Sequence, residues 1–153
     1  MTSSDIRVAA VCTLVLYVKL VAALLAQGGS KFKSGARAPE DVAYVNRKQT
    51  PEEQALFIPP EALEAAKEVE NRWNRIVGND LENIPIGIVV AWVSIAAGGN
   101  STATSALFIL FTVCRIVHTL AFANGVFLPR TLAWTVGVLS TLGLAINAVV
   151  GAF

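Results

Sequence analysis

Several charged side chains stand inside or near the long apolar stretches of this chain, where they could do chemistry together. Four are arginines and two are carboxylates: Arg72, Arg75, Arg115, Arg130, Asp80 and Glu82. If the apolar stretches cross a membrane, each of these charges is costly there, is usually paired, and indicates a functional site by default. Pairing both carboxylates with arginines still leaves positive charge. The set therefore predicts a site that binds an anion.

The spacing of these residues suggests which of them act together. Arg115 and His118 are three residues apart, which places them on one face of a helix. We expect Glu82 to form a structural ion pair with Arg115. His118 fits either helix packing or a catalytic base, and Arg130 fits either a snorkelling anchor or an anion-binding group. Lys19 is expected to reach toward the lipid headgroups.

The elements that must position these groups are membrane-spanning helices. Apolar residues make up 54% of the chain and charged residues 15%, and the mean hydropathy is +0.59. A spanning helix needs about 20 apolar residues. Three stretches supply them: 6–26, 103–123 and 132–153. A fourth, 84–97, is too short alone and must borrow the polar residues before it, back to about Asn79.

Composition excludes other classes of protein. A net charge of +1 excludes a nucleic-acid binder that works by bulk attraction. One histidine and two cysteines exclude a zinc finger or a dense disulfide framework, and no metal site is expected. Cys12 and Cys114 lie in different apolar stretches, so we expect both to be free, buried thiols.

The sequence predicts a single all-α integral membrane domain over residues 1–153, a bundle of four transmembrane helices. The expected elements are helices at about 6–27, 60–97, 102–123 and 129–152, with a loop at 28–59. The first helix is expected to be an uncleaved anchor, because its apolar run is longer than that of a signal peptide. The second is expected to have its first half in water.

The distribution of basic residues predicts the topology. The hydrophilic stretch 28–82 begins with five lysines and arginines, whereas 98–102 has no charge. The positive-inside rule places 28–82 in the cytosol. Under that topology Arg115, His118 and Arg130 converge with the two acids on one layer that faces the cytosol.

Three segments of the chain resemble a known family. They are VENRWNRIVGNDLENIP at 69–85, RIVHTLAF at 115–122 and PRTLAWTVG at 129–137, and APED at 38–41 resembles a loop motif of the same family. The family is MAPEG, the membrane-associated proteins in eicosanoid and glutathione metabolism. The chain looks most like the branch that holds microsomal glutathione transferase 1 and microsomal prostaglandin E synthase 1.

The resemblance implies a homotrimer of four-helix subunits that binds glutathione between subunits, near the cytosolic face. The family's glutathione contacts on the second helix match Arg75, Asn79 and Glu82. Third-helix positions in the same polar site match Arg115 and His118. This assignment agrees with the anion site inferred from charge, because glutathione carries net negative charge.

The resemblance also implies the catalytic residues. Arg130 matches the arginine proposed to hold the glutathione thiolate. Thr131 stands where the prostaglandin synthase has a serine, and Asp41 matches its loop aspartate. Phe122 and Trp134 occupy further glutathione-site positions, at which this branch or the prostaglandin synthase has tyrosine. These departures lower the support for prostaglandin synthesis.

We therefore expect a membrane-bound glutathione transferase that activates the thiolate for attack on lipophilic electrophiles. Glutathione peroxidase activity toward lipid hydroperoxides is a second activity open to the same thiolate. The alternatives are a glutathione-dependent prostaglandin E synthase, a non-catalytic lipid-binding MAPEG scaffold, and an unrelated four-span channel subunit. The expected partners are glutathione, the lipophilic substrate, membrane lipid and two further copies of the chain. The expected location is the endoplasmic reticulum or outer mitochondrial membrane in a eukaryote, and the inner membrane in a bacterium.

Overall fold

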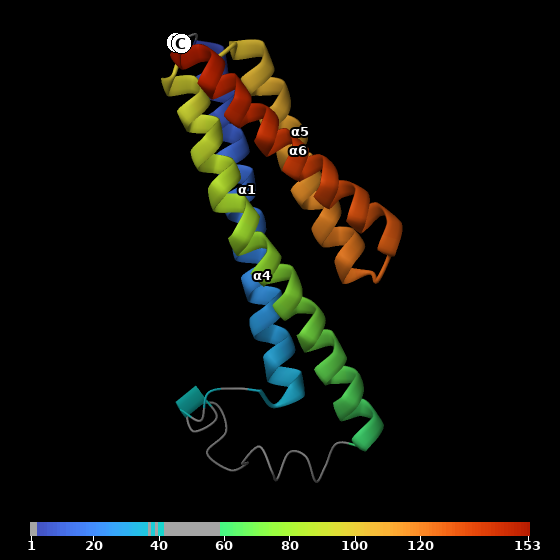
Figure 1. Ribbon diagram of the computed structural model, residues 1–153. Coiled ribbons are helices and arrows are strands. Elements are labelled where there is room, and N and C mark those ends of the chain that lie inside the picture. Colours follow the sequence, from blue (N-terminus) through green and yellow to red (C-terminus); the bar gives the residue numbers. More distant parts are fainter. Residues whose placement is uncertain (1–2, 37, 39, 42–58) are drawn as a thin grey trace. The chain divides into compact units, whose positions relative to one another are not determined.

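The computed structural model describes residues 3–36, 38, 40–41 and 59–153. Within these residues the long elements are all helices (Figure 1): α1 (Ser3–Ser34), α4 (Pro60–Ala96), α5 (Ser101–Ala123) and α6 (Phe127–Ala152). Each of the four is long and apolar enough to cross a membrane. The predicted fold class, an all-α protein with four helices able to span a membrane, is confirmed.

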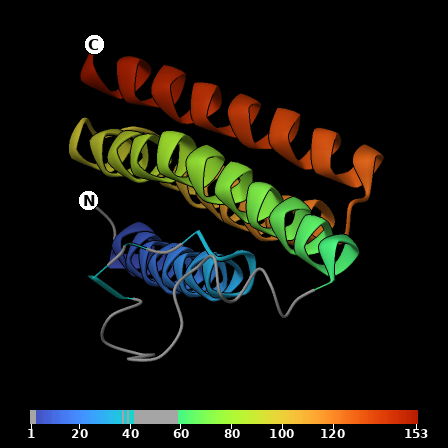
Figure 2. The same cartoon turned by 90° about the horizontal axis from the view of Figure 1, so that it is seen from below.

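The chain divides into two compact units. Unit 1 consists of Met1–Val21 and Gly78–Phe153, and unit 2 consists of Ala22–Val77. Both α1 and α4 contribute to each unit. Within unit 1, α5 and α6 pack against each other and run antiparallel across a short turn, as the views in Figures 1 and 2 show.

The core of unit 1 draws on all four helices. Fully or nearly fully buried apolar side chains form one cluster, which includes Leu16, Ile84, Ala91, Phe108, Phe111 and Leu144. The exposed side chains on the opposite helix faces are also large and apolar, among them Leu14, Val89, Leu139 and Val150. Apolar side chains on the outside as well as the inside are what a helix surrounded by lipid requires.

The first helix is longer than its apolar run. α1 continues to Ser34, so the prediction that it ends near Gln27 is wrong. In unit 2 the polar side chains of this extension are hydrogen-bonded to α4: Gln27 Nε2 donates to Asn74 Oδ1 at 2.8 Å, and Ser34 Oγ donates to Glu70 Oε2 at 2.5 Å. Gly35, with φ of 78°, ends the helix in the left-handed conformation that glycine adopts readily.

The other three helices begin and end within two residues of the predicted ranges. Of the predicted loop at 28–59, residues 37, 39 and 42–58 lie outside the described residues.

The second helix passes through a proline and a glycine without a break. Pro85 lies inside α4 and has no N–H to donate to the carbonyl of Leu81. Two residues on, Gly87 leaves room for the ring of Phe111 from α5, and a Cβ added to Gly87 would overlap that ring. Gly87 therefore lets α5 approach the α4 backbone closely.

A network of uncharged polar groups joins α4, α5 and α6 near the α4–α5 turn. We call it the amide network; its members are Ser94, Asn100, Thr104 and Asn147. Asn147 Nδ2 lies 3.0 Å from Ser94 Oγ, 2.8 Å from Thr104 Oγ1 and 3.1 Å from the Asn100 carbonyl oxygen. Asn147 Oδ1 accepts from the Asn100 backbone N–H at 3.1 Å. One side chain on α6 thus binds groups from both neighbouring helices and the turn between them.

Candidate functional site

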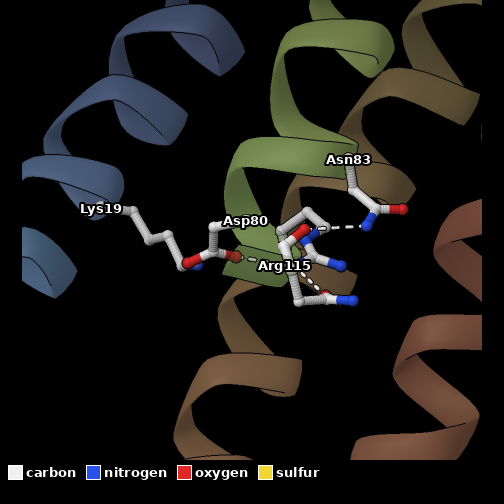
Figure 3. Close-up of polar contacts among 5 residues, drawn as sticks. Lys19, Asp80, Asn83 and Arg115 are labelled. Atoms are coloured by element: carbon white, nitrogen blue, oxygen red, sulfur yellow. Dashed lines mark hydrogen bonds and ion pairs between the residues drawn. The ribbon is translucent and has the colours of Figure 1, made fainter. Parts of the chain in front are cut away.

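Three charged side chains from three helices meet inside unit 1. Arg115 Nη2 on α5 donates to Asp80 Oδ1 on α4 at 2.6 Å, and Lys19 Nζ on α1 donates to Asp80 Oδ2 (Figure 3). The side chains of Asp80, Arg115 and Lys19 are 0%, 1% and 10% exposed. We call these three residues the charge cluster. Two cations share one carboxylate there, so the charge cluster carries net positive charge.

Asn79, the neighbour of Asp80 on α4, is attached to the same arginine. Its Oδ1 accepts from Arg115 Nη2 at 2.7 Å. Its backbone carbonyl accepts a hydrogen bond from Asn83 Nδ2 at 2.8 Å (Figure 3). Because the amide oxygen of Asn79 is bound to Arg115, its two N–H groups are the polar atoms left to contact a ligand.

The charge cluster corrects two predictions. Arg115 pairs with Asp80 and not with Glu82. The two acids are two residues apart, so they project about 200° apart around α4 at 3.6 residues per turn. Asp80 lies one turn before the buried Ile84, whereas Glu82 is exposed. Lys19 does not reach toward the headgroups, because a buried carboxylate lies within its reach and offers stronger pairing.

A second group of predicted site residues lines one small pocket between α5 and α6. The pocket has a volume of about 120 Å³ and is lined by His118, Arg130, Thr131 and Trp134. We call it the α5–α6 pocket. His118 is 3% exposed and Arg130 is half-buried. Two residues predicted to act in one polar site, His118 and Arg130, are therefore brought together.

Aromatic rings hold the guanidinium of Arg130 at this pocket. Its Cζ lies 4.7 Å from the ring centroid of Phe122 and 5.4 Å from that of Phe127. Among the described residues Arg130 forms no hydrogen bond or ion pair, so its N–H groups are unpaired there. The ring of Phe122 also meets the His118 imidazole edge-on, with centroids 5.7 Å apart. Stacking on aromatic faces fixes a guanidinium without using its donors.

Three buried polar atoms on one turn of α5 have no hydrogen-bond partner among the described residues: Arg115 Nε, His118 Nδ1 and Thr119 Oγ1. Buried polar atoms are nearly always hydrogen-bonded, and an exception calls for an explanation such as a ligand or water. The hydroxyl of Thr131, by contrast, donates to the Phe127 carbonyl at 3.1 Å. Thr131 can therefore accept a hydrogen bond in the pocket, but its proton is already in use.

The predicted residues of α4 and Asp41 do not line the α5–α6 pocket. Arg75, Asn79 and Glu82 recur at helical spacing on α4, and Arg75 and Glu82 are exposed. Arg75 belongs to unit 2, as does Asp41, which is exposed and whose backbone N–H donates to the Ala38 carbonyl at 3.0 Å.

The sequence analysis did not predict that Lys19 and Asp80 pair with each other inside unit 1. The signal was present: a lysine within an apolar run needs a buried anion, and Asp80 stands in helical phase with Ile84. The two cysteines are as predicted, since Cys12 and Cys114 are both free and buried.

Comparison with known proteins supports the reading of the motifs. A search of curated proteins gave no significant match. The sequence model of the MAPEG family, by contrast, matches residues 8–150, which include most of each of the four helices and every residue of the charge cluster and the α5–α6 pocket. This family includes glutathione transferases and prostaglandin E synthases. The chain belongs to the MAPEG family.

Proposed function

We propose that this protein is a membrane glutathione transferase, which activates the thiolate of glutathione for attack on lipophilic electrophiles. One observation carries the proposal. The guanidinium of Arg130 is held on two phenyl rings beside the α5–α6 pocket, and its donors are unpaired among the described residues. A cation that is held in place and has unpaired donors is suited to bind an anionic group of the substrate.

The chemistry needs such a cation. A free thiol has a pKa of about 8.5, so only a few per cent is ionised at neutral pH, and the thiolate is the reactive form. A guanidinium next to the sulfur favours the charged form and so raises the thiolate fraction. The thiol loses its proton to water. The sulfur then bonds to the electrophilic carbon, and the leaving group departs with the bonding electron pair.

The same thiolate could reduce a lipid hydroperoxide. The sulfur attacks the terminal peroxide oxygen, the O–O bond breaks, and the alcohol leaves with a proton. A second glutathione displaces water from the sulfenic acid to give the disulfide. Two thiols are thus oxidised for each hydroperoxide reduced. Peroxidase activity therefore requires no group beyond those assigned to the transferase.

The other site residues would bind the rest of the glutathione molecule. Arg115 is assigned to a glutathione carboxylate, through the donor that has no partner among the described residues. Arg75, which belongs to unit 2, keeps only the role that the resemblance implies. Asn79 offers its amide N–H groups, and the exposed Glu82 can accept the glutathione ammonium. In the family arrangement these side chains act across a subunit boundary. We therefore include a homotrimer and a cytosol-facing site in the proposal.

Prostaglandin E synthase is the weaker candidate within the same chemistry. Phe122 presents a ring face to Arg130 and has no hydroxyl, and the Thr131 proton is bound to the Phe127 carbonyl. Both features reduce the number of donors that could assist an isomerisation. A non-catalytic scaffold would not need an arginine that is held in place with its donors unpaired. These points favour the transferase.

Ultraviolet difference spectroscopy of glutathione with the purified protein tests the proposal. The wild-type protein is expected to produce a thiolate absorption band, and Arg130→Ala is expected to abolish the band. Arg7→Ala, which removes an exposed arginine of α1, is the matched control and should leave the band intact. Absence of a band in the wild-type protein, or its persistence in Arg130→Ala, would refute the assignment.

A further inference from the structure

Lys19 is the one member of the charge cluster that lies outside the sequence segments resembling the family, and the proposed function gives it no role. It stands inside the apolar run of α1, and its side chain is 10% exposed. Its ammonium donates to Asp80 Oδ2, while Arg115 Nη2 donates to the other oxygen, Oδ1. Each oxygen of the buried carboxylate is therefore bound to a different cation (Figure 3).

This arrangement fixes the orientation of Arg115 and Asn79 as well as that of the carboxylate. With one cation on each oxygen, Asp80 cannot turn about its Cβ–Cγ bond without breaking a charged hydrogen bond. Its Oδ1 therefore holds one N–H of Arg115 Nη2, and the other N–H of the same nitrogen reaches Asn79 Oδ1. The orientation of the Asn79 amide thus depends on Lys19, through Asp80 and Arg115.

Lys19 also sets the sign of the buried charge. Asp80 and Arg115 alone would be neutral as a pair, and Lys19 makes the charge cluster net positive. Buried charges interact strongly, because the surrounding medium is much less polarisable than water. Arg115 Nε and His118 Nδ1 lie on the α5 turn that adjoins the charge cluster, and both are buried without a partner among the described residues. A net positive charge beside such atoms favours an anion.

We propose that Lys19 is a positioning residue for the anionic co-substrate. It holds Asp80, Arg115 and Asn79 in the orientation that binds glutathione, and it supplies the extra positive charge that attracts the glutathione carboxylates. This inference rests on the proposed function. It differs from a purely structural ion pair between α1 and α4, which would stabilise the protein without distinguishing charged from uncharged ligands.

The test compares the affinities of two ligands. Glutathione and its diethyl ester, in which both carboxylates are blocked, are titrated calorimetrically into the full-length protein in lipid nanodiscs. In Lys19→Met, which keeps the length and apolar stem of the side chain, glutathione affinity is expected to fall about tenfold, equivalent to about 1.4 kcal/mol. Affinity for the ester should change much less. Lys19→Arg restores the charge and should bind glutathione within about twofold of wild type, well under that 1.4 kcal/mol step.

Two further variants make the result decisive. Lys67→Met removes an exposed lysine that pairs with Glu64 on α4, and it should leave both affinities unchanged. Lys19→Gln keeps a donor for Asp80 while removing the charge, so it serves if Lys19→Met does not fold, and the same selective loss is expected.

A folded Lys19→Met or Lys19→Gln protein that binds glutathione as wild type does would overturn the inference, and so would an equal loss for glutathione and the ester. If the wild-type protein binds no glutathione at all, it is the proposed function that fails.

Discussion

Unit 1 contains two buried polar regions, and they join helices through different kinds of polar group. The amide network joins α4, α5 and α6 with uncharged groups, and its buried side-chain atoms all have partners among the described residues. The charge cluster joins α1, α4 and α5 with ions, carries net positive charge, and adjoins buried atoms on α5 without partners. Both regions tie helices together.

The difference indicates which region serves function. Uncharged hydrogen bonds can hold membrane helices together at modest cost. Buried ion pairs contribute little net stability, because the loss of hydration offsets much of the attraction. Helix packing alone would therefore be served by a second amide network. A net positive charge cluster with unpartnered neighbours is better explained by a ligand that completes it.

The largest effect on stability is expected from Asp80→Asn. The substitution leaves Lys19 and Arg115 buried without their carboxylate, and breaking a buried ion pair from one side costs about 3–5 kcal/mol. Unfolding of the protein in detergent, followed by circular dichroism against denaturant, measures the loss. A loss below about 1 kcal/mol, the range of exposed pairs, would mean that the charge cluster is not buried as described.

Asn147→Leu tests the amide network in the way that Asp80→Asn tests the charge cluster. It removes the shared partner of Ser94, Thr104 and the Asn100 backbone, and the unsatisfied groups should cost about 1–3 kcal/mol of stability. Glutathione affinity should stay at the wild-type value, since the amide network contacts none of the proposed site residues. Thermal unfolding and calorimetric titration on the same sample check both parts. A selective loss of glutathione binding would contradict the division of roles.

Phe122→Leu should affect the thiolate more than the fold. It removes the nearer ring beneath Arg130, and a cation–π contact is worth about 0.5–2 kcal/mol. The fraction of bound glutathione present as thiolate at neutral pH should fall, while Phe122→Tyr, which keeps the ring, should retain the wild-type fraction. A pH titration of the ultraviolet thiolate band compares the variants. Equal bands in Phe122→Leu and wild type would show that the rings do not position Arg130.

The smallest effect on stability is expected from Glu82→Gln. This carboxylate is exposed and, unlike Asp80 two residues earlier, takes no part in the charge cluster. Substitutions at such surface positions usually change stability by less than about 0.5 kcal/mol. Measured beside Asp80→Asn under the same denaturant conditions, the variant directly compares the two acids. A large loss in Glu82→Gln would reinstate the ion pair with Arg115 that the sequence suggested.

The helices could be predicted from the sequence more fully than the pairing between them. Apolar runs define where a helix can cross a membrane, so α4, α5 and α6 lie close to the predicted ranges. The extension of α1 to Ser34 depends on hydrogen bonds from polar side chains to another helix, which a hydropathy pattern does not contain.

The positions of the candidate site residues could be predicted only in part. The resemblance named His118, Arg130 and Thr131, and the structure places them at one pocket. The choice of Asp80 over Glu82 as the partner of Arg115 required knowing which face of α4 is buried. Helical phase with Ile84 and Ala91 could have indicated that face, because Asp80 precedes them by four and eleven residues. No motif contains Lys19, and its partner lies sixty-one positions along the chain, so the one signal for its pairing was a lysine inside an apolar run.

The missing side chain at Gly87 has a consequence for the chemistry two helical turns away. The ring of Phe111 lies where Gly87 has no Cβ, so α5 packs close to α4 at this point. Arg115 follows Phe111 by one turn and Asp80 precedes Gly87 by two, so this close contact lies near the point where the guanidinium meets the carboxylate. Gly87 thus permits the close contact between α4 and α5 beside this ion pair. A methyl group there would overlap the Phe111 ring, so either the ring or α5 would have to move, one turn from Arg115.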